Sequence, residues 1–253
     1  MKYKIRYCLW VCNSFFPWKK DINTPEKAVV ILPYFSLERI KHAKYMVRSL
    51  LRCNFVREII ATSHNPELDI FKWVHIRDPR LKLINNNETK KGPGYRWFIA
   101  NTVDSDYFLV IDDDFLIFPG QLATLFRFLI EGPDIPHGVS GKLVIDGKFY
   151  TRKNMEVEIL SQIFAVTRKH IEKYMEIIDI IKTNRPDIYP SIEEIADDIV
   201  ISRAGKQKPR IHDVGYNLRC KTASKKGVAL NQNKSFWPKR LAFKRVLDDI
   251  CNI

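Results

Sequence analysis

Three short apolar runs constrain the fold of this chain more than any other feature of its sequence. They span Ala28–Leu32, which Pro33 ends, Glu58–Thr62 and Tyr107–Ile111. Runs that are apolar on both faces of an extended chain are typical of strands in a parallel sheet that helices cover on both sides. Between the first two runs, Leu37–Cys53 has apolar residues at helical spacing. This order of strand, helix and strand predicts an open, doubly wound α/β sheet.

The remaining elements extend this pattern. We expect a strand at Leu81–Ile84 and a helix at Arg96–Thr102. After Pro119 the pattern predicts a helix at 121–131, short strands within 137–150, a strand at 159–166, and helices at 170–183 and 192–203. The sequence has no linker-like segment between these two parts, so we expect them to be halves of one domain.

Charge is distributed unevenly along the chain. Its 42 basic and 29 acidic residues give a net charge of +13. Residues 203–253 contain 13 basic and 3 acidic residues, so this segment alone carries +10. Such a segment indicates an anionic partner, and the charge leaves open whether that partner is nucleic acid, a membrane or a phosphorylated substrate.

The cysteines and the N-terminal region bear on the compartment. The five cysteines form no CxxC pair, so we expect reduced and mostly buried thiols rather than a disulfide framework or a zinc ribbon. The apolar stretch Tyr7–Trp18 is shorter than the ~20 residues that span a membrane. It also lacks the small-residue cleavage site of a signal peptide. We therefore expect a cytoplasmic protein, free or bound at a membrane surface, with the secretory-pathway lumen as the alternative.

Three consecutive carboxylates, Asp112, Asp113 and Asp114, directly follow the strand predicted at Tyr107–Ile111. Adjacent carboxylates repel one another unless a cation neutralises them, and a hard divalent cation such as Mg²⁺ or Mn²⁺ prefers such oxygen ligands. Asp112 and Asp114 would project to the same side if the chain stays extended. The alternative is a helix cap or a solvated turn, because Asp favours both.

A second acidic cluster lies near the start of the helix predicted at 192–203. Ser191 and Glu194 have capping-box spacing, which is a sufficient structural role for Glu194. Asp197 and Asp198 lie further into the helix, where Asp is a weak helix former. A carboxylate in this position could act as a base or stabilise positive charge in a transition state.

Two further residues are candidates for contacts with phosphate. Arg96 follows Gly92-Pro93-Gly94 and could reach a diphosphate with two hydrogen bonds, although a solvated surface arginine is an equal alternative. His212 is a candidate metal ligand or phosphate contact, with a purely structural role as its alternative. The sequence has no P-loop, GxGxxG, HExxH or GxSxG pattern, which argues against the enzyme classes that use them.

Together these segments resemble a GT-A glycosyltransferase, and most closely the exostosin-like family (glycosyltransferase family 64). Three parts carry the resemblance: the AVVIL strand with its following helix, the YFLVIDDD segment with its DxD pattern, and ADDIVIS about 85 residues later. The last segment is similar to the catalytic Asp-Asp-Ile of the family. The resemblance implies a Rossmann-like nucleotide-binding half with a mixed central sheet, fused to an acceptor-binding half.

The resemblance also implies a role for each residue that matches these motifs. Asp114 would bind the metal, Mn²⁺ or Mg²⁺, and Asp112 would contribute to the same metal shell. Asp112 and Asp113 would contact the ribose or sugar of the donor. Asp198, with Asp197, would be the catalytic carboxylate pair beside the sugar. Further donor contacts are implied for Asn65 after the second strand, for Arg96, and for Arg240 after Trp237.

The domain boundaries follow from the same resemblance. Residues 28–253 would form one GT-A domain, with a nucleotide-sugar-binding half at 28–118 and an acceptor and catalytic half at 119–253. Residues 1–27 have no counterpart and are treated as an N-terminal extension. The sequence before Arg96, with Lys90 and Lys91, departs from the Asn/Arg-rich run of the family, so the identity of the donor stays open.

The resulting hypothesis is metal-dependent transfer of a hexose or N-acetylhexosamine from a nucleotide sugar, with UDP as the expected nucleotide. The acceptor would be a hydroxyl of a glycan or glycoconjugate, and the resemblance implies retention of configuration. A nucleotidyltransferase with paired carboxylates and a basic nucleic-acid-binding protein are the alternatives. For the leading hypothesis we expect no nucleic-acid partner. The surplus positive charge near Phe236, Trp237, Leu241 and Phe243 would suit a peripheral contact with an anionic membrane.

Overall fold

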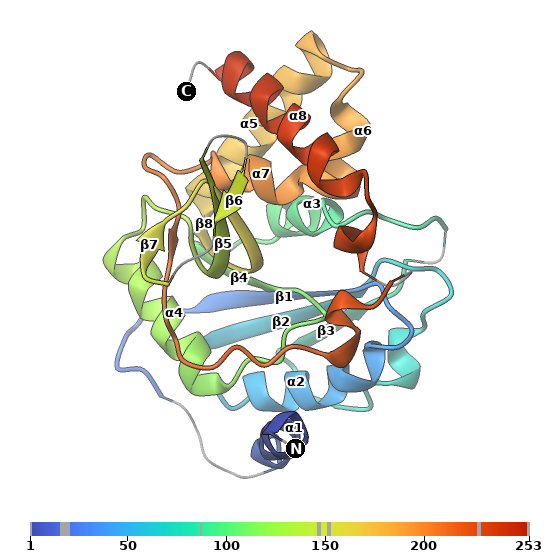
Figure 1. Cartoon of the computed structure of the whole chain (residues 1–253). Coiled ribbons are helices and arrows are strands. Elements are labelled where there is room, and N and C mark those ends of the chain that lie inside the picture. Colours follow the sequence, from blue (N-terminus) through green and yellow to red (C-terminus); the bar gives the residue numbers. More distant parts are fainter. Residues whose placement is uncertain are drawn as a thin grey trace.

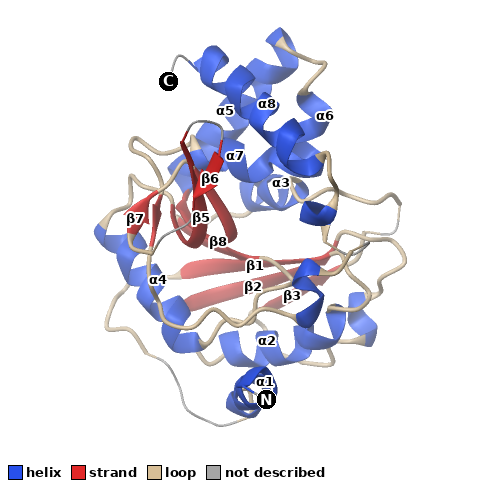
Figure 2. Ribbon diagram, viewed as in Figure 1, coloured by secondary structure: helices blue, strands red, loops and turns tan. Residues whose placement is uncertain are grey.

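One mixed β-sheet runs through the centre of the molecule, with helices on both of its faces (Figures 1 and 2). The computed structural model describes residues 2–15, 21–86, 88–145, 148–150, 153–226 and 229–251. Within these residues the strand order is β3 (Leu81–Ile84), β2 (Val56–Ser63), β1 (Ala28–Tyr34), β4 (Tyr107–Ile111), β8 (Ile159–Thr167), β5 (His137–Ile145), β9 (Arg210–Ile211) and β7 (Met155–Glu156), with β6 (Lys148–Tyr150) paired to β5. The predicted α/β class is confirmed.

The first half of the sheet is parallel, as the apolar runs predicted. Strands β3, β2, β1 and β4 all run in one direction, so their carboxyl ends meet at one edge. The second half is mainly antiparallel: β8 pairs antiparallel with both β4 and β5. The expected mixed sheet is therefore confirmed, and its change of direction falls between β4 and β8.

Strand β1 extends two residues beyond the prediction, through Pro33 to Tyr34. The Tyr34 carbonyl accepts a hydrogen bond from His64 N, after β2, at 2.7 Å. Because bonding directions alternate along a strand, Pro33 faces the side of β4. Pairing between β1 and β4 ends at Ile31 and Val110, so no ladder there requires an N–H group from Pro33.

Two layers of helices cover the sheet. The helical elements are α1 (Lys2–Asn13), η1 (Ile40–His42), α2 (Ala43–Leu50), η2 (Ile70–Lys72), α3 (Tyr95–Thr102), α4 (Pro119–Glu131), α5 (Arg168–Asn184), α6 (Tyr189–Ser191), η3 (Ile192–Ala196), α7 (Asp197–Ser202), η4 (Lys221–Ser224), η5 (Leu230–Gln232) and α8 (Phe236–Cys251). Val30 and Leu32 of β1 belong to the apolar cluster with α1, α2 and α4. Val29 and Ile31 belong to the cluster with α3, α5, α7 and α8. Residues that alternate along one strand thus pack against opposite layers.

The N-terminal region packs against the body of the protein. The Trp10 side chain of α1 is fully buried, and its Nε1 donates to the Ile117 carbonyl at 3.0 Å. The Tyr7 hydroxyl lies 3.1 Å from His42 Nδ1. The sequence did not predict α1 as a helix, because its apolar residues lie on more than one face, and only the packing of Trp10 distinguishes the inner face.

The helix predicted at 192–203 begins earlier and is less regular than expected. Helical structure starts at Tyr189, and Ile192–Ala196 forms a π-helical turn before α7. Ser191 has helical dihedral angles and makes no capping hydrogen bond. The predicted capping box with Glu194 is therefore wrong, because Pro190 occupies the first turn and Ser191 lies inside the helix.

The four cysteines whose side chains the structure describes are free thiols. Cys53 and Cys220 are buried, whereas Cys8 and Cys12 on α1 are exposed. The expectation of mostly buried cysteines therefore holds for the two in the body and fails for the two on α1.

Candidate active site

The acidic triplet lies where β4 ends, at the carboxyl edge of the parallel strands. The Asp112 amide donates to the Gln162 carbonyl at 2.8 Å, and the Phe115 amide donates to the Asp112 carbonyl at 3.1 Å. The chain therefore turns directly after β4. The chain is therefore not extended through the triplet, and each of its three carboxylates pairs with a different arginine.

Asp113 is bound on both of its oxygens. Arg39 Nη1 donates to Oδ1 at 2.7 Å, and the amides of Phe35 and Ser36 both donate to Oδ2 at 3.2 Å. Arg39 is held in turn by the Thr222 carbonyl at 3.0 Å. Burial raises the pKa of the Asp113 carboxyl, and the nearby Arg39 charge opposes that rise. Asp113 thus holds the loop after β1 against the triplet.

Asp114 has one oxygen bound and one oxygen without a partner. Arg219 Nη2 donates to Oδ2 at 2.8 Å, and the Gln162 amide oxygen, when turned toward Arg219, accepts from Arg219 Nε at 2.8 Å. Oδ1 of Asp114 is buried and has no hydrogen-bond partner among the described residues. A buried carboxylate oxygen without a partner is costly, and a bound cation would satisfy it.

Arg96 connects the triplet to the second acidic cluster. Its guanidinium pairs with Asp112, and its Nε donates to Asp197 Oδ2 at 2.8 Å. Trp97 Nε1 donates to the same Asp197 oxygen at 2.8 Å. Arg96, Trp97 and Asp197 are all buried. Burial lowers the pKa of Arg96, but the Asp112 and Asp197 carboxylates outweigh it and raise the pKa overall.

Asp198 pairs with an arginine from the C-terminal helix. Arg240 Nη1 and Nη2 donate to the two carboxylate oxygens at 2.7 and 2.9 Å, and Arg240 also donates to the Ile195 carbonyl. The guanidinium lies 5.0 Å from the Phe236 ring centre and 5.6 Å from that of Trp237. Burial raises the pKa of Asp198, against the charge of Arg240. Helix α8, which the sequence did not predict, therefore closes this end of the site.

The loop before α3 packs directly on the second cluster. The Gly94 amide donates to the Glu193 carbonyl at 3.2 Å. A Cβ atom on Gly92 would lie 1.9 Å from the same carbonyl oxygen. Gly92 is therefore required for the close approach of two backbones.

Asn65 lies at the carboxyl end of β2, and its amide holds local structure. Its Nδ2 donates to the Phe35 carbonyl at 3.2 Å, and its Oδ1 accepts from the Glu67 amide at 3.1 Å. The peptide groups of Phe35 are thus held by Asn65 on one side and by Asp113 on the other, while 45% of the Phe35 side chain stays exposed. Phe35 thus has a fixed backbone beside the triplet and an exposed side chain.

One continuous series of contacts therefore connects the predicted site residues. It runs from Asn65 through Phe35 to the triplet, and then through Arg96 to the Asp197-Asp198 pair and Arg240. The sequence singled out neither Arg39 nor Arg219, because a single arginine carries no positional signal. For Arg219 the only indication was its place in the basic segment.

Charge at this site is nearly balanced within the protein. Five carboxylates meet four guanidinium groups, which leaves a net charge of −1 when all groups are ionised: Asp112, Asp113, Asp114, Asp197 and Asp198 against Arg39, Arg96, Arg219 and Arg240. Burial raises the pKa of Asp112 to about 7, although Arg96 opposes this rise. The site therefore favours one additional positive charge.

The residues present fit a divalent cation that has few protein ligands. Among the described residues, no group of three or more His, Cys, Asp or Glu side chains is arranged to hold a metal ion. Asp114 offers a free buried oxygen, and the Asp112 side chain is 30% exposed. Mg²⁺-type sites commonly take one or two carboxylates and complete their shell with phosphate oxygens and water. Asp114 and Asp112 supply one or two carboxylates of the type that such a site uses.

His212 lies in a different environment from the one predicted. Its Nε2 is 2.8 Å from His137 Nδ1, and its ring stacks on Phe128 with 3.8 Å between ring centres. Burial lowers the pKa of His212 to about 4. The His212 ring therefore packs against His137 and Phe128, in the second half of the domain. The suggestion that it faces a diphosphate is wrong.

Nearly half of the basic side chains in the C-terminal segment pair with acidic groups of the protein. Six of its basic side chains form ion pairs with acidic groups, namely Arg203, Lys206, Arg219, Lys225, Arg240 and Lys244. Phe243 and Leu247 of α8 are buried. The structure gives no support to the predicted membrane contact of this segment, because Phe243 is buried and Phe236, Trp237 and Leu241 are only partly exposed. Among the described helices, none is both long and apolar enough to cross a membrane.

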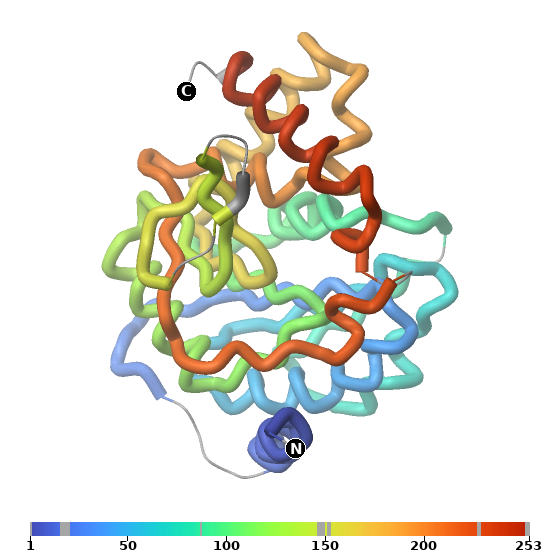
Figure 3. The backbone as a smooth tube through the Cα atoms, viewed as in Figure 1, coloured from blue at the N-terminus to red at the C-terminus, as the bar shows by residue number. Residues whose placement is uncertain are grey.

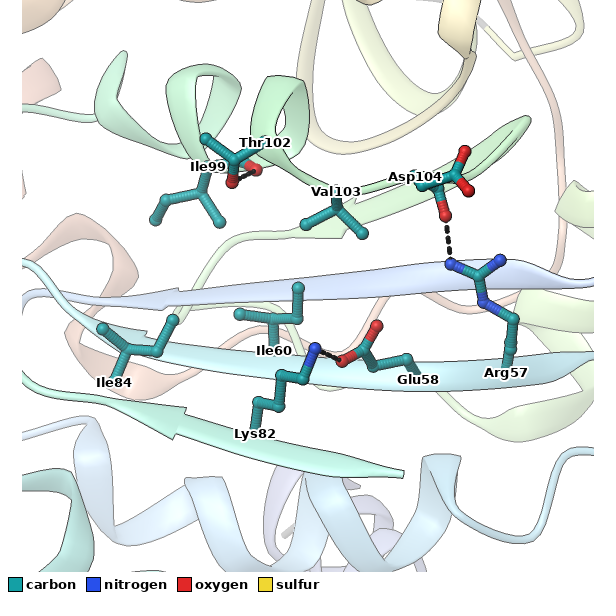
Figure 4. A pocket seen from close by; sticks show the side chains of 9 residues that line it. All are labelled: Arg57, Glu58, Ile60, Lys82, Ile84, Ile99, Thr102, Val103 and Asp104. Atoms are coloured by element: carbon teal, nitrogen blue, oxygen red, sulfur yellow. Dashed lines mark hydrogen bonds and ion pairs between the residues drawn. The ribbon is translucent and has the colours of Figure 1, made fainter. Parts of the chain in front are cut away.

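Two pockets lie elsewhere on the molecule. One of about 430 Å³ is formed by β2, β3, α3 and the residues after α3, where Lys82 pairs with Glu58 and Arg57 donates to the Asp104 carbonyl (Figure 4). Another of about 730 Å³ is lined by residues between Phe71 and Leu83. None of the predicted site residues lines either pocket.

The fold is of the GT-A type, with a Rossmann-like first half. GalNAc-T7, solved with UDP, GalNAc and Mn²⁺, superposes with a TM-score of 0.55 and 10% identity over 88% of this chain and 48% of that chain. The mannosyltransferase PcManGT from Pyrobaculum calidifontis, solved with GDP-Man and Mn²⁺, gives a TM-score of 0.52 and 14% identity over 89% of this chain and 66% of that chain.

A CMP:2-keto-3-deoxy-manno-octonic acid synthetase with CTP matches 60% of this chain and 78% of that one at 14% identity, with a TM-score of 0.43. No protein-family profile matches the sequence, and neither does any curated protein. At these identities the likeness concerns the fold alone.

Proposed function

We propose that this chain is a metal-dependent glycosyltransferase that takes its sugar from a nucleotide sugar. The observation that carries this proposal is the juxtaposition of two acidic clusters through Arg96 at the carboxyl edge of a GT-A sheet. Ligands of open α/β sheets bind at this edge, near the point where the strand order changes. Here that point lies between β1 and β4, and the triplet follows β4 directly.

The charge of the site supports a metal-bound diphosphate. With a net charge of −1, the protein groups alone would repel a nucleoside diphosphate. Asp114, with Asp112, would hold Mn²⁺ or Mg²⁺, which when bound neutralises negative charge on the leaving diphosphate. Arg219 already pairs with Asp114, so its guanidinium is near enough to share the phosphate charge.

The donor nucleoside would lie along the loop after β1. Phe35 presents an exposed ring beside Asp113, and Asn65 holds its backbone. An aromatic face whose backbone is fixed can stack on a nucleobase at little cost in conformational entropy. In this arrangement Asn65 acts as a positioning residue for Phe35, and the ribose would lie near Asp113. UDP is the nucleotide that the resemblance to family 64 suggests.

The two carboxylates of α7 would have different roles. Asp197 is buried beneath Arg96 and Trp97, so it positions Arg96 rather than touching the sugar. Asp198 is the less buried of the two and would face the sugar, where its charge stabilises an oxocarbenium-like centre or orients the acceptor. Transfer of a hexose or N-acetylhexosamine to a glycan hydroxyl, with retention of configuration as in the exostosin-like family, completes the proposal.

A thermal-shift panel of nucleotide sugars with and without Mn²⁺ tests this function. We expect at least one UDP-sugar to stabilise the protein only when Mn²⁺ is present, and free UDP to accumulate during incubation. A panel without any nucleotide-dependent shift would overturn the proposal. Release of pyrophosphate from a nucleoside triphosphate and a sugar phosphate would identify a nucleotidyltransferase instead.

A further inference from the structure

The outer face of α1 exposes an apolar stripe that the catalytic proposal does not use. Ile5, Leu9 and Phe15 are 52, 58 and 60% exposed. Cys8 and Cys12 lie between them and are also exposed. Residues 5, 8, 9 and 12 follow helical spacing, so they form one continuous face.

The opposite face of α1 is firmly attached to the protein. Trp10 is fully buried and donates to the Ile117 carbonyl, and Tyr7 contacts His42. The exposed stripe is therefore a second apolar face of a docked helix, rather than the core-facing side of a detached one. Apolar residues gathered on the solvent side of a short helix indicate an interaction surface.

Positive charge surrounds this stripe. Residues 1–20 contain five basic and no acidic residues. The neighbouring elements add exposed cations: the Arg48 guanidinium lies 5.0 Å from the Phe15 ring centre, Lys44 lies 4.9 Å from that of Tyr45, and Lys221 lies 5.5 Å from that of Tyr3. Figure 1 shows α1 beside α2, at the end of the molecule opposite α8.

We propose that α1, with the outer side of α2, docks the protein on an anionic lipid surface. An apolar helix face with a basic border is the pattern of a helix that lies in the membrane interface, with its apolar side chains among the acyl chains and its cations at the headgroups. A second copy of this chain fits the surface less well, because both partners would bring the same positive charge.

Sedimentation with vesicles tests this surface. We expect the full chain to bind phosphatidylcholine vesicles that contain phosphatidylserine, to bind pure phosphatidylcholine weakly, and to dissociate as salt is raised. Ile5→Asp/Leu9→Asp should weaken binding by about tenfold or more, since it removes apolar contact and adds repulsion. The control Ile180→Asp changes an exposed apolar residue of α5 and should bind as the wild type does.

The outcomes separate the occupants of this surface. The proposal is overturned if the wild-type protein does not bind anionic vesicles, or if the double variant binds them as tightly as the wild type does. A concentration-dependent dimer that Ile5→Asp/Leu9→Asp dissociates would assign the surface to a second copy. Because both residues lie outside the active site, circular dichroism and the nucleotide-dependent thermal shift should be unchanged in the double variant, which shows that the loss of binding is not a loss of folding.

Discussion

The two acidic clusters of this protein carry the same kind of charge, but they differ in how fully the protein itself satisfies their carboxylate oxygens. In the pair on α7, Asp197 is covered by Arg96 and Trp97, and Asp198 is bound by both nitrogens of Arg240. In the triplet after β4, Asp114 keeps a buried oxygen without a partner among the described residues. The pair therefore resembles a scaffold that is complete within the protein, and the triplet resembles a site that needs a ligand.

This difference shows why a run of carboxylates does not define a site by itself. A carboxylate that is fully hydrogen-bonded inside the protein has little capacity left for a cation. The clusters can therefore be separated experimentally: loss of the contacts that bury Asp197 should act mainly on stability, and changes in the triplet mainly on ligand binding and catalysis.

The largest expected effect is on stability, from Arg96→Met. This change leaves Asp197 buried with Trp97 as its remaining donor and removes the partner of Asp112. An uncompensated buried charge costs about 3–5 kcal/mol, so we expect the urea midpoint to fall sharply. The control Arg57→Met lies on the exposed start of β2 and should change stability by less than about 0.5 kcal/mol. Equal midpoints for both variants would contradict a scaffold role for Arg96.

The next effect is on catalysis, from Asp114→Asn. The amide keeps the shape of the side chain but removes the charge that would hold the metal. We expect sugar transfer to fall by about 10²–10³-fold and the Mn²⁺-dependent thermal shift to disappear, while the urea midpoint stays close to that of the wild type. Asp106→Asn, an exposed residue before β4, is the matched control. Retained Mn²⁺ dependence in Asp114→Asn would remove this residue from the metal site.

A smaller effect is expected from Gly92→Ala, at the loop that joins the clusters. The new Cβ atom would press on the Glu193 carbonyl, and overpacking of this kind costs about 1–3 kcal/mol. Displacement of α7 should lower kcat more than it raises KM for the donor, because the triplet itself is not touched. Gly132→Ala, whose Cβ would come no nearer than 3.2 Å to the His137 ring and 3.5 Å to the Phe128 carbonyl oxygen, serves as the control. A variant with unchanged kcat would show that the spacing of the clusters is not critical.

The smallest effect is a pH dependence that comes from His64, beneath the same loop. Its carbonyl accepts from the Lys91 amide at 2.9 Å and its ring packs on Tyr95, while burial and the nearby Arg96 charge lower its pKa to about 4. In the unfolded chain the pKa of histidine is about 6.5. The contribution of neutral His64 to the free energy of unfolding is therefore fully present above pH 6.5 and is lost as the pH falls toward 4. The urea midpoint of His64→Gln should decline less than that of the wild type between these values. If the urea midpoints of the variant and the wild type decline equally, the loss of stability in acid comes from other groups.

Much of the fold was predictable from local pattern. The strands at Leu81–Ile84 and Tyr107–Ile111 were predicted to the residue, because the local apolar pattern of each segment favours a strand. Helices α1 and α8 were not predicted, because the faces that they bury are recognised only through what they pack against. The π-helical turn before Asp197, which packs against the loop at Gly92, was not predicted either.

The sequence by itself determined the class of fold and the presence of two acidic clusters, because apolar periodicity and charge runs are local properties of a chain. It also indicated Arg96 and Arg240 through resemblance. Only the tertiary structure decided that Arg96 joins the clusters, that Arg39 and Arg219 belong to the site, and which carboxylate oxygen is left without a partner. Those facts depend on contacts between residues up to about a hundred positions apart, which local patterns do not encode.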